Sequence, residues 1–152
     1  MRTEAWLKQQ LTLIWQNFFP DIERKNSLEI QFGRKCRNQM GSVKLKGKMT
    51  IITINGLFRN ESIPDYVITA TIAHELVHYA HGFSSPHPQL ARYPHQGGIV
   101  TRELIERGLD NVLKQQKQWL KENWKNYLQK YFPHLLNRSR RVYTYRFNFW
   151  PF

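Results

Sequence analysis

The chain has 152 residues, of which 41% are hydrophobic and 14% aromatic, which suits one domain with a sizeable core and excludes a disordered tail. Its formal net charge of +12 makes nucleic acid the first partner to consider, with a solubilising basic surface as the simpler alternative. One cysteine, Cys36, excludes an intramolecular disulfide and a thiolate zinc cluster within one chain. Because the apolar runs are too short for a membrane span and the N-terminus does not resemble a signal peptide, we expect a cytoplasmic protein without a membrane partner.

The first third of the chain predicts one helix followed by a small antiparallel sheet. Residues 3–18 form an amphipathic pattern that Thr3 can cap. Alternating apolar and polar residues at 27–33 and 42–54 predict strands, with a tight turn at Gly47 and Lys48 inside the second range. The sheet is expected to pack on the helices that come before and after it.

Helices dominate the remainder of the chain. One is predicted from Asp65 to about His81, with Asn60 or Ser62 as its cap, Pro64 in its first turn and a glycine at its end. Residues 83–94 contain three prolines and two serines and predict a loop. Further helices are expected from 95–98 to about 107 and over 110–131, where Pro133 ends the second, and alternating aromatics predict a strand at 141–150. The fold class is therefore α+β, as a single domain over residues 1–152 with an extra C-terminal helix and strand.

The central helix contains an H-E-x-x-H pentapeptide, residues 74–78. Two histidines four residues apart lie on one helix face, so His74 and His78 can bind the same zinc ion, and Glu75 is placed to activate the water on that zinc. The alternative is a core helix with two stray histidines. That alternative would bury an unpaired carboxylate at Glu75, which is costly. The pentapeptide therefore predicts a zinc hydrolase.

A catalytic zinc usually has a third protein ligand. The metzincin pattern is excluded, because His81 and Ser84 stand where it requires glycine and histidine. His81 lies nearly two turns beyond His74, so we expect it at the rim of the site. Glu103 and Glu106 would make the protein a gluzincin, unless they belong to a solvated helix face paired with neighbouring arginines. The remaining candidates for the third ligand are His87, His95, Glu103 and Glu106.

The order of elements resembles the SprT-like (Spartan-type) zinc metallopeptidase domain over residues 1–108. The shared order is a helix, a small sheet, a proline-started helix with the pentapeptide, a loop, and a histidine that opens a helix. In that family the third ligand opens an H-G-x-x-aliphatic segment, which matches His95 to Ile99 here except that Gln96 replaces the glycine. The resemblance implies that His95 completes the site for one zinc ion and that Glu75 activates the zinc-bound water to hydrolyse peptide bonds. The family's cysteine-rich zinc ribbon is missing, and residues 109–152 form a basic, aromatic extension instead.

Basic residues gather in two places in the sequence. Residues 111–152 carry nine lysines and arginines against one acid, Glu122, and Arg34 to Lys48 contains a second cluster without an acid. Lysines can follow phosphates and exposed aromatics can stack on bases, although core packing is the simpler role for the aromatics. The resemblance to DNA-dependent relatives implies action on DNA-associated proteins. The residues predicted to contact DNA are Lys114, Lys117, Lys121, Lys125, Arg138, Arg140 and Arg141.

One alternative belongs to a different functional class. It is a nucleic-acid-binding protein in which the zinc site is structural or degenerate. The intact Glu75 argues against that reading, since a structural zinc site does not need a general base.

Overall fold

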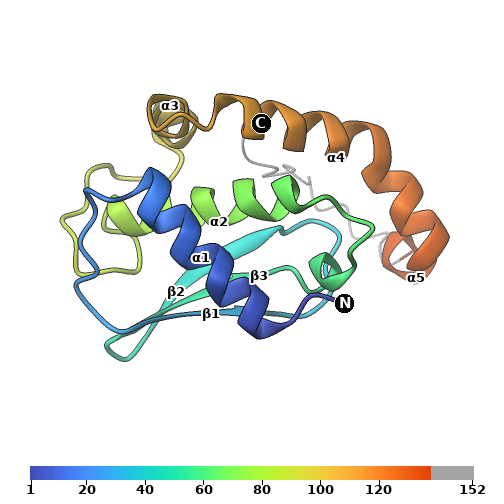
Figure 1. Ribbon diagram of the computed structural model, residues 1–152, viewed down its shortest axis with the longest axis horizontal. Coiled ribbons are helices and arrows are strands. Elements are labelled where there is room, and N and C mark those ends of the chain that lie inside the picture. Colours follow the sequence, from blue (N-terminus) through green and yellow to red (C-terminus); the bar gives the residue numbers. More distant parts are fainter. Residues whose placement is uncertain (138–152) are drawn as a thin grey trace.

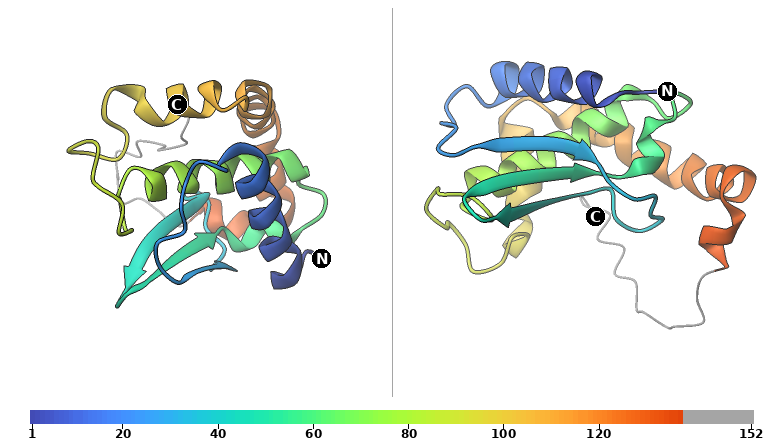
Figure 2. Two further views of the ribbon diagram at one scale, coloured as in Figure 1. Left: turned by 60° about the vertical axis from the view of Figure 1, so that its left-hand side comes forward. Right: turned by 90° about the horizontal axis from the view of Figure 1, so that it is seen from below.

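One face of a three-stranded sheet carries the helices. The structure, a computed structural model, describes residues 1–137. Helices α1 (Glu4–Phe18) and α2 (Asp65–Ala80) lie on the sheet, and α3 (Ile99–Glu106) and α4 (Asp110–Tyr131) cover α2 from the other side (Figure 1). The opposite face of the sheet is turned away from the described helices (Figure 2). Helix α2 is therefore the middle layer, and the predicted α+β class is confirmed.

The sheet is mixed rather than antiparallel throughout, which corrects one expectation. Strands β1 (Leu28–Phe32), β2 (Gly41–Lys46) and β3 (Met49–Ile54) lie in the order β1-β3-β2. The tight turn makes β2 and β3 antiparallel, whereas β1 pairs with β3 in parallel because the connection 33–40 carries the chain past β3 to the far edge. Alternation in a sequence shows which face of a strand is buried, and it contains no information on strand direction. The edge position of β2 follows from this order.

The entry to α2 also differs from the expectation. Pro64 occupies the N-cap position, and no side chain caps the helix. The amide oxygen of Asn60 accepts instead from the N–H of Ser62 (2.9 Å), so it closes the preceding turn. The neighbouring segment Gly56–Arg59 forms a short 3₁₀ helix. The predicted capping role of Asn60 or Ser62 is therefore wrong, and Asp65 in the first turn supplies the negative charge that favours a helix start.

A buried arginine holds this entry in place. Arg2 is 5% exposed, and its guanidinium pairs with the carboxylate of Asp65. It also donates to three backbone carbonyl oxygens around the 3₁₀ helix, those of Phe58, Asn60 and Ile63. These contacts fix the start of α2 relative to the N-terminus of the chain.

Helix α4 belongs to the same hydrophobic core as α1, α2 and the sheet. Leu113, Leu120 and Trp124 are buried in that core. The side chain of Gln116, which is fully buried, donates to the carbonyl of Val67 (3.0 Å) on α2. The basic extension thus completes the core, at least up to residue 137.

The end of the described chain departs from the predicted pattern at one point. Pro133 does not simply end a helix: α4 stops at Tyr131, and Pro133 begins a further short helix, α5 (Pro133–Leu136). Proline suits a first turn because the N–H that it lacks has no partner there. The strand predicted at 141–150 lies outside the described residues. Among the described helices, none combines the length and the apolar character required to span a bilayer.

Candidate metal centre

Helix α2 holds two histidines on one face in a buried setting. From Val67 onward almost every residue of the helix is buried, because the sheet packs on one side and α3 and α4 on the other. His74 is 1% exposed, and its ring lies 4.7 Å from the ring of His78, centroid to centroid. The spacing of four residues thus brings the two imidazoles side by side, as the pentapeptide predicts.

The loop after α2 returns the chain to the same place. Gly82 ends the helix with φ +80°, and the N–H of Phe83 donates to the carbonyl of His78 (3.0 Å). Two further hydrogen bonds fasten the loop to its surroundings: Ser85 Oγ to the carbonyl of Tyr79 (2.6 Å), and the N–H of Leu90 to the carbonyl of His81 (3.0 Å). The loop is therefore attached to the end of α2 from which it departs.

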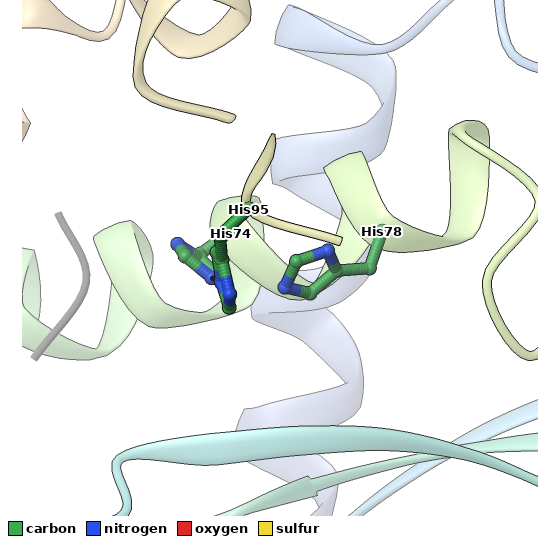
Figure 3. A group of neighbouring side chains, drawn as sticks. All are labelled: His74, His78 and His95. Carbon is green, nitrogen blue, oxygen red and sulfur yellow. Dashed lines mark hydrogen bonds between the residues drawn. The ribbon is translucent and has the colours of Figure 1, made fainter. Parts of the chain in front are cut away.

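A third histidine meets the first two at the end of this loop. The Nε2 atoms of His95 and His74 are 2.9 Å apart, and one ring nitrogen from each of the three histidines lies within 4.8 Å of the others. Figure 3 shows the three rings gathered together, two from α2 and the third from the loop. Three imidazoles arranged in this way can hold a metal ion. The sequence prediction of His74, His78 and His95 as one group agrees with this geometry.

The surroundings keep these imidazoles neutral, which is the form that binds metals. Burial, followed by the neighbouring rings of His78 and His95, lowers the pKa of His74 well below its usual range. Burial, followed by His95 and His81, lowers the pKa of His78 to about 3. Burial also lowers the pKa of His95. At neutral pH each ring thus has a lone pair to offer, and an all-imidazole set suits zinc, copper, iron or nickel.

Glu75 lies beside the histidines and is 2% exposed. Burial raises the pKa of its carboxyl to about 8. Gly41, at the start of β2, faces this carboxyl: a Cβ there would come within 3.0 Å of Glu75 Oε1 and of the Thr71 methyl group. Sequence reasoning missed Gly41, although a glycine at the start of a strand is a signal of close approach.

A cleft opens beside this group. Its volume is about 460 Å³, and Glu75, His78 and His95 contribute to its wall. The edge strand β2 borders the cleft on one side and the loop after α2 on another. The other lining residues are Asn38, Gln39, Gly41, Ser42, Val43, Phe83, Ser84 and Pro94. A molecule in the cleft would thus touch two of the three histidines, the carboxyl and the sheet edge together.

The structure places the other candidate ligands elsewhere. His87 Nε2 lies 2.7 Å from the carbonyl oxygen of Glu23, away from the histidine group. Glu103 Oε1 lies 3.0 Å from His81 Nε2, and Glu106 is exposed on α3. Within residues 1–137, neither glutamate belongs to the group of side chains close enough together to hold an ion. The geometry therefore disfavours the gluzincin arrangement.

Comparison with known proteins adds no relative to this picture. The chain significantly matches no family model, no curated protein and no solved structure. The resemblance to SprT-like domains therefore remains an interpretation of residue order. Any functional assignment depends on the histidine group, Glu75 and the cleft that joins them.

Proposed function

We propose that the protein is a zinc-dependent metallopeptidase of the SprT-like kind. The observation that carries the proposal is the buried carboxyl of Glu75 beside three converging imidazoles, with Glu75 and two of the three histidines in the wall of an open cleft. A structural zinc site is usually closed by four protein ligands and needs no general base. The site here offers three histidines and a carboxyl, which is the pattern of a hydrolytic site.

The residues divide the chemistry between them. His74, His78 and His95 would hold the zinc ion, which when bound supplies a Lewis acid that acidifies water and polarises a carbonyl group. Glu75 accepts the proton of the attacking water and passes it to the leaving amine. The positive charge of a zinc ion held by these histidines would favour the ionised carboxyl of Glu75 and would oppose burial, which raises its pKa. The carboxyl is thereby prepared to act as a base near neutral pH.

Among the described residues no strand pairs with the outer edge of β2, and this free edge supports a polypeptide substrate. In an antiparallel pair, successive residues turn their backbone groups alternately toward the partner strand and away from it. The N–H of Asn55 donates to the carbonyl of Met40 (2.8 Å), so Gly41 and then Val43 turn theirs toward the free edge. The carbonyl of Val43 indeed accepts from Ser84 Oγ (3.2 Å) on the cleft side. An extended peptide can add to this edge and cross the cleft in front of Glu75.

The test is the Glu75→Gln variant, assayed for zinc content and for hydrolysis of casein. Loss of the base is expected to lower turnover by about 100-fold or more, while zinc content stays at one ion per chain. Glu106→Gln, an exposed change of the same kind, is the control and is expected to match the wild type. Undiminished turnover in Glu75→Gln, or a wild-type protein without zinc, would overturn the proposal.

We propose further that DNA brings this peptidase to its substrates. Four lysines, spaced by three or four residues, form one exposed stripe along α4: Lys114, Lys117, Lys121 and Lys125. Lys125 and Arg37 line one hollow, so the stripe meets the second basic cluster there. Asn38 lines both this hollow and the metal cleft. A phosphate backbone that follows the lysines would thus lead to the cleft.

Two aromatic residues of α4 belong to the core and not to this surface. Trp124 and Tyr127 are buried and stack on each other, with ring centroids 5.7 Å apart. Core packing is therefore the role of these two rings, whereas Tyr131 at the end of α4 is 46% exposed. The other basic residues that the sequence predicts for this role, Arg138, Arg140 and Arg141, lie outside the described residues.

Salt dependence tests the DNA proposal. Each lost phosphate contact is expected to flatten the slope of log K against log salt for a duplex by about 0.9. Changing Lys114, Lys117, Lys121 and Lys125 to alanine together should therefore flatten it by up to about 3 to 4 units. Fluorescence anisotropy with a labelled duplex measures this slope, and no binding at low salt would end the proposal. DNA binding with no hydrolysis in any condition would favour the nucleic-acid-binding alternative.

A further inference from the structure

The loop that carries His95 is closed at its base by two side chains in contact, one buried and one partly buried. His81 ends α2 immediately before the loop, and Glu103 lies on α3 immediately after it. Their Nε2 and Oε1 atoms are 3.0 Å apart, and the side chains are 2% and 24% exposed. We propose that this pair, here called the clasp, positions His95 and thereby sets the metal affinity of the histidine group. The inference depends on the proposed metal site and not on peptide hydrolysis.

The clasp continues into a set of polar contacts that anchors α3. Glu103 Oε2 lies 3.7 Å from Nε of Arg107, one turn further along the helix. The guanidinium of Arg107 then pairs with Asp21 (2.6 Å) and donates to the carbonyl of Phe18 (2.8 Å) at the end of α1. Helix α3 is thus tied to α2 through Glu103 and to α1 through Arg107. The end of the metal-binding loop takes its position from this anchored helix.

The segment that presents His95 is internally ordered. The N–H of Gln96 donates to the carbonyl of Tyr93 (3.2 Å), and the side-chain oxygen of Gln96 accepts from the N–H of Arg92 (3.1 Å). The N–H of Gly98 donates to the carbonyl of His95 (3.3 Å). These bonds shape the turn, but each lies within residues 92–98. Apart from the contact of His95 with His74 itself, the placement of the turn over α2 therefore comes from its two flanks, which the clasp joins.

Two glycines between His95 and α3 make the orientation of His95 more dependent on the clasp. Gly97 and Gly98 link His95 to α3 with φ +61° and +70°, and no atom lies within 4 Å of the position that a Cβ would take on either. The link is thus open to solvent and is not held by packing at these residues. An anchored α3 is what restricts the orientations that this link can give to His95. If Glu103 loses its partner, the third ligand gains freedom while His74 and His78 remain fixed on α2.

Two other roles for Glu103 make different predictions. As a metal ligand it would have to leave His81 and reach a group to which it does not belong. In a purely structural role, its loss would lower the stability of the fold without acting through His95. A double-mutant cycle with His95 separates these roles, because only a positioning residue loses its effect on metal binding when the ligand it positions is already absent.

The experiment uses the full chain as wild type, Glu103→Ala, His95→Ala and the double variant, with Glu106→Ala on the same helix as the control. Zinc affinity is measured by competition with a chromophoric chelator, at a temperature where circular dichroism shows every variant to be folded. The absorption spectrum of the cobalt-loaded protein reports the ligand set. Glu103→Ala is expected to weaken zinc binding by about 10- to 100-fold, Glu103→Gln by less because it keeps a hydrogen-bond acceptor, and Glu106→Ala not at all.

The double-mutant cycle of Glu103 and His95 gives the decisive result. Glu103→Ala is expected to weaken zinc binding in the wild-type background and to leave it unchanged in the His95→Ala background. Equal weakening in both backgrounds, or none in either, overturns the clasp while the metal site stands. A wild-type protein that binds neither zinc nor cobalt overturns the metal site itself, and the clasp with it. The two failures are therefore distinguishable.

Discussion

Helix α2 and the loop that follows it supply the same kind of ligand in opposite ways. The helix is buried on nearly all sides, and its regular turn alone brings His74 beside His78. The loop is largely exposed, and it delivers His95 from a distance of 21 residues along the chain. One half of the site is thus fixed by local geometry, and the other half depends on how distant elements pack. Metal affinity should accordingly be robust to changes around the loop's surface and sensitive to changes at its anchors.

The difference between the two halves should be largest in variants that each lack one ligand. His95→Ala leaves a pair already ordered on one helix, whereas His78→Ala leaves two ligands on separate elements. Because ordering one side chain costs about 0.5 to 1.5 kcal/mol, we expect His78→Ala to bind zinc about 2- to 10-fold more weakly than His95→Ala. Calorimetric titration with zinc measures both variants.

A third histidine variant serves as the control for this pair. His87 lies in the same loop but bonds to the carbonyl of Glu23. His87→Ala should therefore keep the affinity of the wild type. Equal losses in His78→Ala and His95→Ala would show that the loop is as well ordered in advance as the helix, which would remove the distinction between the two halves.

The sequence was sufficient to predict the helix half of the site. The spacing of His74 and His78 needs only the period of a helix, and Gly82 marks the end of α2 by its backbone conformation. The same local signals gave the strands, because alternation of apolar residues depends only on near neighbours. The position of Glu75 beside the first histidine followed from the pentapeptide, whereas its burial, at 2% exposed, was not predicted from the sequence.

These local signals do not predict contacts between residues that are far apart in the chain. Nothing local distinguishes His95 from His87 or from the glutamates of α3 as a third ligand, because the choice depends on the path of the loop through space. The approach of Gly41 to Glu75, the parallel pairing of β1 with β3, and the His81–Glu103 pair likewise join residues far apart in the chain. The resemblance to a known family selected His95 where the physical signals alone left several residues open.

The buried helix and the exposed surface of α3 each carry a glutamate, and the two carboxyls should titrate differently. Glu75 on α2 is buried and its pKa is raised from 4.5 to about 8, whereas Glu106 on α3 is exposed. The unfolded chain releases the Glu75 proton near pH 4.5 and the folded, metal-free chain does so only near pH 8. The metal-free wild type should thus lose stability across this window as the pH rises. Since one pKa unit corresponds to about 1.4 kcal/mol, the loss is at most about 5 kcal/mol.

The variant Glu75→Gln isolates this effect. Its stability advantage over the metal-free wild type should be near zero at pH 4.5, grow with pH, and level off above about pH 8. Chemical denaturation at several pH values measures the difference, and contributions from the histidines are common to both proteins. Glu106→Gln should show no such trend. An advantage that shrinks as the pH rises would contradict the assignment of Glu75 as a buried carboxyl.

The smallest expected effect is the loss of stability when a loop glycine is replaced, and it should differ between two glycines. Both Gly82 and Gly97 have positive φ, but a Cβ on Gly82 would approach the carbonyl oxygen of His87 to 2.4 Å, whereas nothing lies within 4 Å at Gly97. Gly97→Ala should therefore cost only backbone strain, about 1 kcal/mol, or a fall of about 2 to 4 °C in the melting temperature. Gly97→Asn should cost less, since asparagine tolerates this conformation, and Gly82→Ala should cost more than either. If Gly97→Ala were as damaging as Gly82→Ala, the link between His95 and α3 would be packed rather than open, and the freedom that the clasp is proposed to restrain would not exist.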